Sequence, residues 1–178
     1  LLGSNGMVFW LYGLSGSGKS TMAVEMEKRL HEKGIHSVVL DGDNLRSGLN
    51  QDLSFSENDR RENIRRVSEV AKILSENGII VFVSLITPLR AFRQNARTII
   101  GDHYFQEVFV KASFNTCQER DVKGLYAKAS DGLVPSFTGQ GSDFEEPVDQ
   151  QFIIDSEKES EDISSEKLFQ FVLDSISL

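Results

Sequence analysis

The sequence predicts an α/β fold, a three-layer sandwich in which a mainly parallel sheet of about five strands lies between two layers of helices. Two observations carry this prediction. Short apolar runs alternate with helical patterns along the whole chain. The runs are apolar enough to be buried strands, which is typical of a parallel sheet covered on both faces. Because the chain has 178 residues, we expect one domain, residues 1–178, with a closed hydrophobic core.

The expected elements follow one another in a regular order. Strands are expected at residues 7–13, 36–42, 78–86, 106–112 and 151–155. Helices are expected at residues 18–33, 60–76, 89–99, 114–120 and 164–176. Ser56 is the candidate cap of the second of these helices, and Ser164 and Ser165 are the candidate caps of the last one.

Residues 122–150 break this alternation. The stretch is rich in Gly, Ser, Asp and Pro, and few compact domains contain a connection of that length. It is expected to be a lid over a site, a binding loop or a disordered segment. The acidic stretch at residues 155–166 is expected to be a solvated connector.

Composition narrows the range of functions. The net charge of −8 argues against general nucleic-acid binding, although positive charge gathered in one cleft would still allow an anionic small substrate. The longest apolar run, residues 79–86, is far shorter than the roughly 20 residues that span a bilayer. A single cysteine, Cys117, cannot form an intrachain disulfide, so we expect a reducing compartment, the cytoplasm. No secretory signal is visible, and the start at Leu1 leaves open that the chain was cut from a longer protein.

The strongest motif is GLSGSGKS, from Gly13 to Ser20, which matches the phosphate-binding pattern G-x-x-x-x-G-K-[ST] between a strand and a helix. Its glycines let backbone N–H groups approach phosphate oxygens, and the following helix adds its positive end. Lys19 is expected to reach the β- and γ-phosphates, and Ser20 to bind Mg²⁺. The predicted nucleotide-binding set is Gly13, Ser15, Gly16, Ser17, Gly18, Lys19, Ser20 and Thr21. The competing interpretation is a glycine-rich turn that only links the two elements.

The second expected strand ends in the sequence LDGDNLRSGLN, residues 40–50. Ligands of open parallel sheets bind beyond the carboxyl ends of the strands, so Asp41, Asp43 and Arg46 are expected to face the same crevice as the phosphate loop. A carboxylate there could accept a proton from an acceptor hydroxyl or hold Mg²⁺ through its water shell. The alternative is a tight turn of polar residues.

A third segment, residues 55–73, contains the start of the second expected helix. Arg60 and Asn63 lie one turn apart on one helical face, so both could reach one ligand. Phe55 could pack as a hydrophobic staple or serve as a platform for a base. The competing interpretation is a solvated face held by pairs such as Glu62–Arg66.

Taken together, GLSGSGKS, DGDNLRSGLN, FSENDRRENIRRVSEVAKI, RDVKGLYAKA and FTGQGSDFEEP resemble the adenylyl-sulfate kinase (APS kinase) family, in this order and at these spacings. The resemblance runs from about Asn5 to Asp155. It implies a P-loop NTPase-type fold with a mobile lid at about residues 122–150. It also implies transfer of the γ-phosphate of MgATP to the ribose 3′-hydroxyl of adenylyl sulfate, giving 3′-phosphoadenylyl sulfate and ADP.

The resemblance also implies roles for single residues. Asp43 matches the family's candidate base and metal-organising carboxylate, which gives a metal set of Ser20 and Asp43 and a catalytic pair of Asp43 and Lys19. Arg120 falls where the family has an arginine near the ATP adenine. The implied adenylyl-sulfate-binding residues are Asp43, Arg46, Phe55, Arg60, Asn63, Ile86, Thr87, Lys123 and Phe137.

The segment after the third strand departs from the family pattern. Thr87 replaces a serine that is a proposed phosphorylated intermediate in some members, so direct in-line transfer is favoured. Leu89 and Phe92 replace a tyrosine and an aspartate, which weakens the case for a polar contact surface there. The family also often forms homodimers, and a fusion to ATP sulfurylase or an association with it would fit the start at Leu1.

Three other functions are weighed against this one. Another small-molecule kinase, acting on a nucleotide or a sugar, would not need the later motifs. A regulatory domain that binds a sulfonucleotide without turnover would not need Lys19, Ser20 and Asp43, which are all present. A GTP switch is disfavoured because no Asn-Lys-x-Asp motif occurs in the chain.

Overall fold

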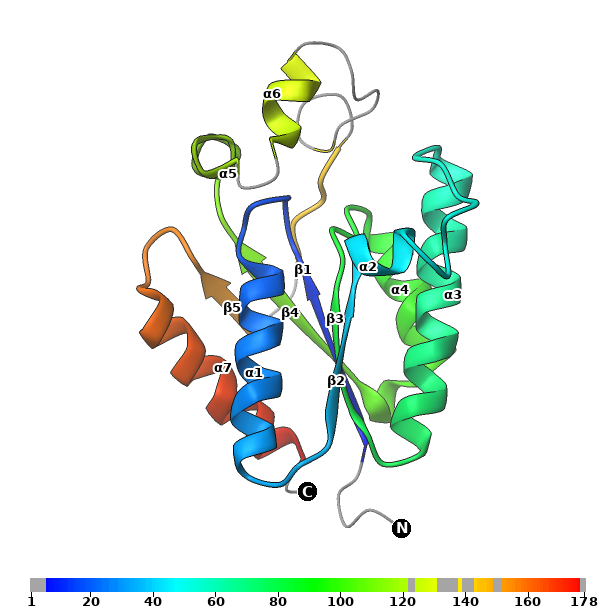
Figure 1. Ribbon diagram of the computed structural model, residues 1–178, viewed down its shortest axis with the longest axis vertical. Coiled ribbons are helices and arrows are strands. Elements are labelled where there is room, and N and C mark those ends of the chain that lie inside the picture. Colours follow the sequence, from blue (N-terminus) through cyan, green and yellow to red (C-terminus); the bar gives the residue numbers. More distant parts are fainter. Residues whose placement is uncertain (1–5, 122–123, 131–137, 139–142, 149–151, 177–178) are drawn as a thin grey trace.

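The computed structural model of the chain describes residues 6–121, 124–130, 138, 143–148 and 152–176 (Figure 1). Five strands form one sheet in which all neighbours are parallel, in the order β2-β3-β1-β4-β5. The strands are β1 (Met7–Tyr12), β2 (Ser37–Asp41), β3 (Ile80–Ser84), β4 (Phe105–Lys111) and β5 (Phe152–Asp155). The helices are α1 (Lys19–Glu32), α2 (Gly42–Arg46), α3 (Glu57–Glu76), α4 (Arg90–Ile100), α5 (Phe114–Arg120), α6 (Leu125–Ser130), α7 (Glu161–Ile176) and the 3₁₀ turn η1 (Asp102–Tyr104).

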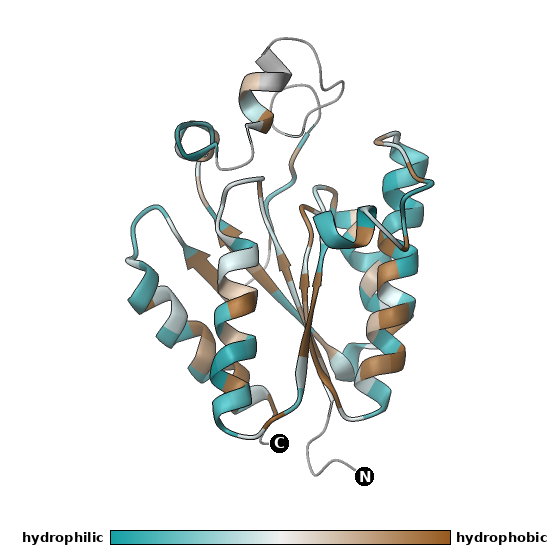
Figure 2. Cartoon of the chain, viewed as in Figure 1, coloured by the Kyte–Doolittle hydropathy of each residue, from teal (hydrophilic) through white to brown (hydrophobic). Residues whose placement is uncertain are grey.

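The sheet is covered on both faces, and alternate residues of β1 show why. Phe9 and Leu11 pack into a core with α1 and α7, whereas Val8 and Trp10 pack into a second core with α3 and α4. All four side chains are fully buried. Figure 2 shows the strands mostly in brown, the apolar end of the scale, while the helices mix apolar and polar residues. The predicted fold class, a parallel sheet between two helical layers, is confirmed.

Helix caps explain where two helices begin. Ser56 accepts a hydrogen bond from the Asp59 amide at 3.2 Å, as predicted, and α3 therefore starts at Glu57 rather than at residue 60. The prediction for the last helix is wrong. Ser164 and Ser165 are buried inside α7, and Ser160 accepts from the Ile163 amide at 3.4 Å. Residues 161–166 are thus helical, and only the first part of the acidic stretch is a connector.

Two short helices lie where the sequence predicted turns or loop. α2 follows β2 directly because the Asp41 side chain accepts from the Asp43 amide and caps it. α6 occupies part of the expected 122–150 loop, and both carboxylate oxygens of Asp121 accept from its first amides. In Figure 1, the carboxyl ends of the strands point towards the upper end of the view. α2, α5 and α6 all lie towards that end. Among the described residues, no helix is long and apolar enough to cross a membrane.

Candidate active site

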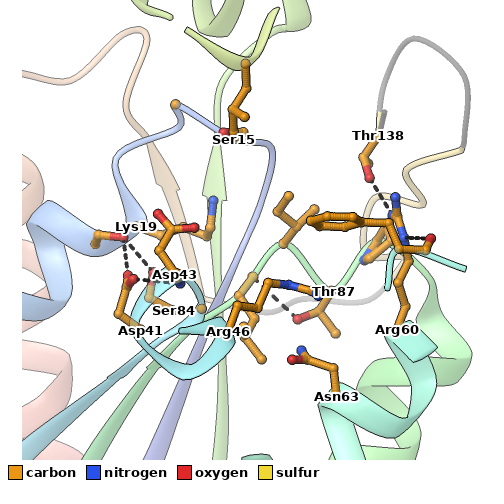
Figure 3. Close-up of a pocket in the computed structure, with 18 of the residues that line it drawn as sticks. Ser15, Lys19, Asp41, Asp43, Arg46, Arg60, Asn63, Ser84, Thr87 and Thr138 are labelled. Atoms are coloured by element: carbon orange, nitrogen blue, oxygen red, sulfur yellow. Dashed lines mark hydrogen bonds between the residues drawn. The ribbon is translucent and has the colours of Figure 1, made fainter. Parts of the chain in front are cut away.

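A pocket of about 360 Å³ opens where β1, β2 and β3 end (Figure 3). Its walls come from the phosphate loop, from α2, from the start of α3 and from the turn after β3. Many of the residues predicted from the sequence line it: Ser15, Gly16, Gly18, Lys19, Ser20, Thr21, Asp43, Arg46, Phe55, Arg60, Asn63, Ile86 and Thr87. Donor-side and acceptor-side candidates thus share one cavity, of a size typical of ligand sites.

The phosphate loop follows β1 and needs glycine at two tightly packed positions. A Cβ atom at Gly13 would lie 2.3 Å from the carbonyl oxygen of Val110, which no real Cβ tolerates. Gly16 has a φ of 80° and backs onto the main chain of Cys117. Gly18 is the N-cap residue of α1 and makes no side-chain cap, and the positive end of this helix suits an anion.

Lys19 and Ser17 take different positions in this loop. Lys19 lines the pocket, and its Nζ donates to the carbonyl of Leu14 at 2.7 Å. Ser17 is fully buried beneath the loop and does not line the pocket, as is also true of Gly13. The nucleotide-binding roles predicted for Gly13 and Ser17 therefore find no side-chain contact with the pocket.

Ser20 joins the phosphate loop to the ends of two strands. Its Oγ donates to Oδ2 of Asp41 at 2.6 Å and lies 3.0 Å from Oγ of Ser84. Asp41 and Ser84 are register partners in the β2–β3 ladder, so both side chains meet at the same edge of the sheet. Sequence reasoning placed Asp41 in the crevice but missed its contact with Ser20, because that contact spans two separate strand–helix units.

The acceptor side of the pocket is positively charged. The Arg46 guanidinium lies 4.2 Å from the Phe55 ring centroid, and Arg60 donates from Nε to the Phe55 carbonyl at 2.9 Å and from Nη1 to Thr138 Oγ1 at 2.8 Å. Burial lowers the pKa of both arginines, and for Arg46 the nearby charge of Arg60 lowers the pKa further. Since arginine stays protonated in proteins, two partly desolvated positive charges face the pocket and favour an anionic ligand.

Asn63 is directed into the pocket by a buried neighbour that sequence reasoning missed. Asn50 is fully buried, and its Nδ2 donates to Oδ1 of Asn63 at 2.9 Å. This bond uses the oxygen of Asn63, so its amide nitrogen is turned towards the ligand space, where Figure 3 shows the side chain among Arg46 and Thr87. Asn50 ends the LDGDNLRSGLN segment, 13 residues before Asn63, but nothing in that segment predicts the contact between the two side chains.

Thr87 adopts an unusual backbone conformation at the end of β3. Its φ is 44°, a left-handed value that is rare for a β-branched residue. The Thr87 hydroxyl accepts from Nε1 of buried Trp10 at 2.9 Å and lies 3.4 Å from the carbonyl of Leu85. The hydroxyl is therefore bonded to Trp10 and Leu85 of the protein itself.

Two residues from later in the chain contact the main chain of the phosphate loop. Arg120 of α5 donates from Nη1 to the Gly16 carbonyl at 3.2 Å, although it does not line the pocket. Tyr126 of α6, a residue that sequence reasoning missed, donates its hydroxyl to the Ser15 carbonyl at 2.7 Å and does line the pocket. The predicted Lys123 and Phe137 lie outside the described residues.

Comparison with known proteins places the chain in a family. The model of the family described as adenylylsulphate kinase matches residues 5–155. A probable adenylyl-sulfate kinase of Halalkalibacterium halodurans is 49% identical over 93% of this chain and 82% of its own length. The Mycobacterium tuberculosis APS kinase CysC, solved in complex with AMPPNP and APS, superimposes with a TM-score of 0.87 at 44% identity, covering 96% of this chain and 97% of that one. A hexameric APS kinase from Thiobacillus denitrificans has a TM-score of 0.67 at 27% identity, covering 97% of this chain and 29% of that one. The chain belongs to the adenylylsulphate kinase family.

Proposed function

We propose that this protein transfers the γ-phosphoryl group of ATP to the ribose 3′-hydroxyl of adenylyl sulfate, giving 3′-phosphoadenylyl sulfate and ADP. The observation that carries the proposal is the shared pocket, in which a phosphate loop faces an arginine pair and an exposed aromatic ring. The loop suits the polyphosphate of the donor, and Arg46 and Arg60 suit the phosphosulfate of the acceptor. Phe55 is 54% exposed although it is aromatic, which suits a platform for a base.

The donor side also fits Mg²⁺ bound together with ATP. Ser20 and Asp41 supply oxygen atoms, the ligand type that Mg²⁺ prefers, and Asp43 stands in the same pocket. Among the described residues, no three His, Cys, Asp or Glu side chains gather as a metal cage. This fits a cation held chiefly by the nucleotide phosphates, whose negative charge it neutralises.

The proposed reaction is a direct in-line transfer. The 3′-hydroxyl oxygen forms a bond to the γ-phosphorus, the bond from that phosphorus to the β,γ-bridging oxygen breaks, and the hydroxyl proton passes to the Asp43 carboxylate. Asp43 suits this role because it lines the pocket from the first turn of α2, whereas Asp41 bonds to Ser20 and to the Asp43 amide. Lys19 would stabilise the charge that develops on the transferred group and on the leaving ADP.

Several further assignments rest on the family resemblance alone. We propose that residues 122–150 act as a lid that excludes water, that Phe137 stacks on the acceptor adenine opposite Phe55, and that Lys123 contacts the acceptor. Arg120 would approach the ATP adenine, which fits its position against the Gly16 carbonyl. We also propose that the protein is a cytoplasmic homodimer, with or without association with ATP sulfurylase. Light scattering would distinguish a dimer from a hexamer.

The test is a coupled assay of ADP release with MgATP and one of four additions: adenylyl sulfate, AMP, gluconate or no acceptor. We expect turnover with adenylyl sulfate to exceed the other three rates by at least about a hundredfold, because only this acceptor presents a phosphosulfate to the arginine pair together with a ribose 3′-hydroxyl. Equal rates in all four reactions would contradict the proposal. A preference for gluconate or AMP would assign the pocket to a different kinase reaction.

A further inference from the structure

Arg93, on α4, lies behind the pocket and does not line it. It is 3% exposed. Its Nη1 donates to the carbonyl oxygens of Thr87 at 2.9 Å and Pro88 at 3.2 Å, and its Nη2 donates to the carbonyl of Glu145 at 2.7 Å. The guanidinium also lies 4.4 Å from the ring centroid of Tyr12. One side chain thus holds main-chain groups from two segments that are far apart in the sequence.

Burying the positive charge of Arg93 costs free energy, which points to a specific function for this side chain. Burial lowers the pKa of Arg93, and the nearest carboxylate, Glu107, is 3.9 Å from its Nε. A buried ion that gains only a loose ion pair is commonly no more stabilising than a well-packed apolar side chain. The planar fork of arginine, in contrast, matches several carbonyl oxygens at once, which an apolar residue cannot do.

The first segment held by Arg93 is a strained part of the acceptor pocket. Ile86, Thr87 and Pro88 all line the pocket, and Thr87 has its left-handed φ of 44°. A strained conformation of this kind persists only where its surroundings fix it. Trp10 holds the side chain of Thr87, and Arg93 holds its carbonyl, so the turn is fixed at two points.

The second segment is residues 144–146, which return to the same turn. The Glu145 amide donates to the Pro88 carbonyl at 2.8 Å, and its carboxylate accepts from the Arg90 amide at 2.6 Å. Phe144 stacks on Phe109, with ring centroids 5.9 Å apart. Arg93 therefore completes a junction in which residues 144–146 brace the outer side of the Thr87–Pro88 turn.

We propose that Arg93 is a positioning residue for the acceptor: it holds the Thr87–Pro88 turn in its strained shape and fastens residues 144–146 against it, and so sets the acceptor wall of the pocket. This inference rests on the proposed function, because it concerns the binding of adenylyl sulfate. Its consequence is selective, since the phosphate loop makes none of these contacts and the donor side of the pocket should not depend on Arg93.

The chain offers a matched control in Arg97, one turn further along α4. Arg97 also pairs with Glu107, at 3.0 Å, and its guanidinium lies 4.9 Å from the ring centroid of Phe105. Its second ion pair is with Asp102, at 3.5 Å, at the opposite end of the helix from the turn. Arg93→Lys and Arg97→Lys therefore make the same chemical change beside the same carboxylate, Glu107. They differ because only Arg93 bonds to the Thr87–Pro88 turn of the pocket wall.

The experiment compares wild type, Arg93→Lys and Arg97→Lys by steady-state kinetics, by titration calorimetry with adenylyl sulfate and by thermal unfolding. We expect Arg93→Lys to raise the KM and the Kd for adenylyl sulfate at least tenfold while the KM for ATP stays within twofold. Arg97→Lys should leave all three constants within twofold. Glu145→Ala, which removes the carboxylate bond to Arg90, should shift the same constants for adenylyl sulfate in the same direction by a smaller factor.

Unchanged adenylyl-sulfate constants in folded Arg93→Lys would overturn the inference, as would an equal rise for ATP. If Arg93→Lys does not fold, Glu145→Ala tests the junction between residues 144–146 and the turn, and unchanged adenylyl-sulfate constants in that variant would overturn the inference. Failure of the proposed function looks different. In that case wild type itself shows no ADP release that depends on adenylyl sulfate and no heat of binding with it.

Discussion

Asp41 and Asp43 stand two residues apart and take different places in the structure. Asp41 ends β2 and uses one carboxylate oxygen for Ser20 and the other for the Asp43 amide. Asp43 sits in the first turn of α2 and lines the pocket, and Figure 3 shows its side chain directed towards the phosphate loop. Asp41 therefore bonds to other groups of the protein and caps α2, whereas Asp43 is proposed to act on the ligand.

This difference predicts the effect of Asp43→Asn at the residue scale. The amide keeps the size of the side chain but cannot accept the acceptor proton, so we expect kcat to fall by about two to four orders of magnitude. The KM for ATP should change little, because the phosphate loop is intact. Steady-state ADP release measures both constants. Asp102→Asn, an exposed site away from the pocket, is the control, and near-wild-type turnover of Asp43→Asn would exclude Asp43 as the base.

At the scale of elements, capping places α3 and with it two acceptor-side residues. Ser56 fixes the first turn of α3, and Arg60 and Asn63 follow within the next two turns. The remaining charges of this helix behave as the simpler interpretation expected. Arg66 pairs with Glu62 at 2.9 Å and with Asp52 at 2.7 Å on the surface, while Arg60 and Asn63 turn towards the pocket. The solvated-face interpretation therefore holds for one face of the helix, while ligand binding by Arg60 and Asn63 stays a prediction that their shared pocket allows.

Loss of this cap should weaken the fold measurably. Ser56→Ala removes the acceptor for the Asp59 amide, and we expect the free energy of unfolding to fall by about 1 kcal/mol. Urea denaturation followed by circular dichroism measures the change. Ser56→Asp restores a capping oxygen and a charge suited to the helix start, and should stay close to wild type. A loss of the same size in Ser56→Asp would show that the cap is not the cause.

At the scale of the whole molecule, one pocket collects residues from almost every strand–helix unit before β4, so ligand binding should stabilise the entire fold. A ligand that binds only the folded state at a hundred times its Kd adds about 2.7 kcal/mol to the free energy of unfolding. We therefore expect MgATP to raise the melting temperature by several degrees.

The measurement is thermal unfolding with and without MgATP in wild type and Lys19→Ala. Lys19 faces the pocket and is the charge predicted to meet the β- and γ-phosphates, so Lys19→Ala should lose most of the rise. An equal rise in both proteins would mean that ATP binds elsewhere. Lys158→Ala, an exposed lysine between β5 and α7, should keep the full rise.

Much of the fold could be predicted because its signals are local. Each strand shows an apolar run and each long helix a periodic pattern within its own residues, and most predicted elements differ from the observed ones only by a few residues at either end. The miss at α7 has a physical cause: Ser164 and Ser165 have capping chemistry, yet burial against the core draws them into the helix. α6 was missed because its cap, Asp121, lies at the end of α5 in a stretch whose composition is that of a loop.

Contiguous motifs and periodic patterns in the sequence were enough to predict the parallel sheet and the phosphate loop, and to name many of the residues that line the pocket. Tertiary structure alone decided how those residues are held. The bonds Ser20–Asp41, Asn50–Asn63 and Arg93–Glu145 join residues 21, 13 and 52 positions apart. Such contacts depend on how separate strand–helix units meet in space, and hydrogen bonds across that distance leave no periodic signal in the chain.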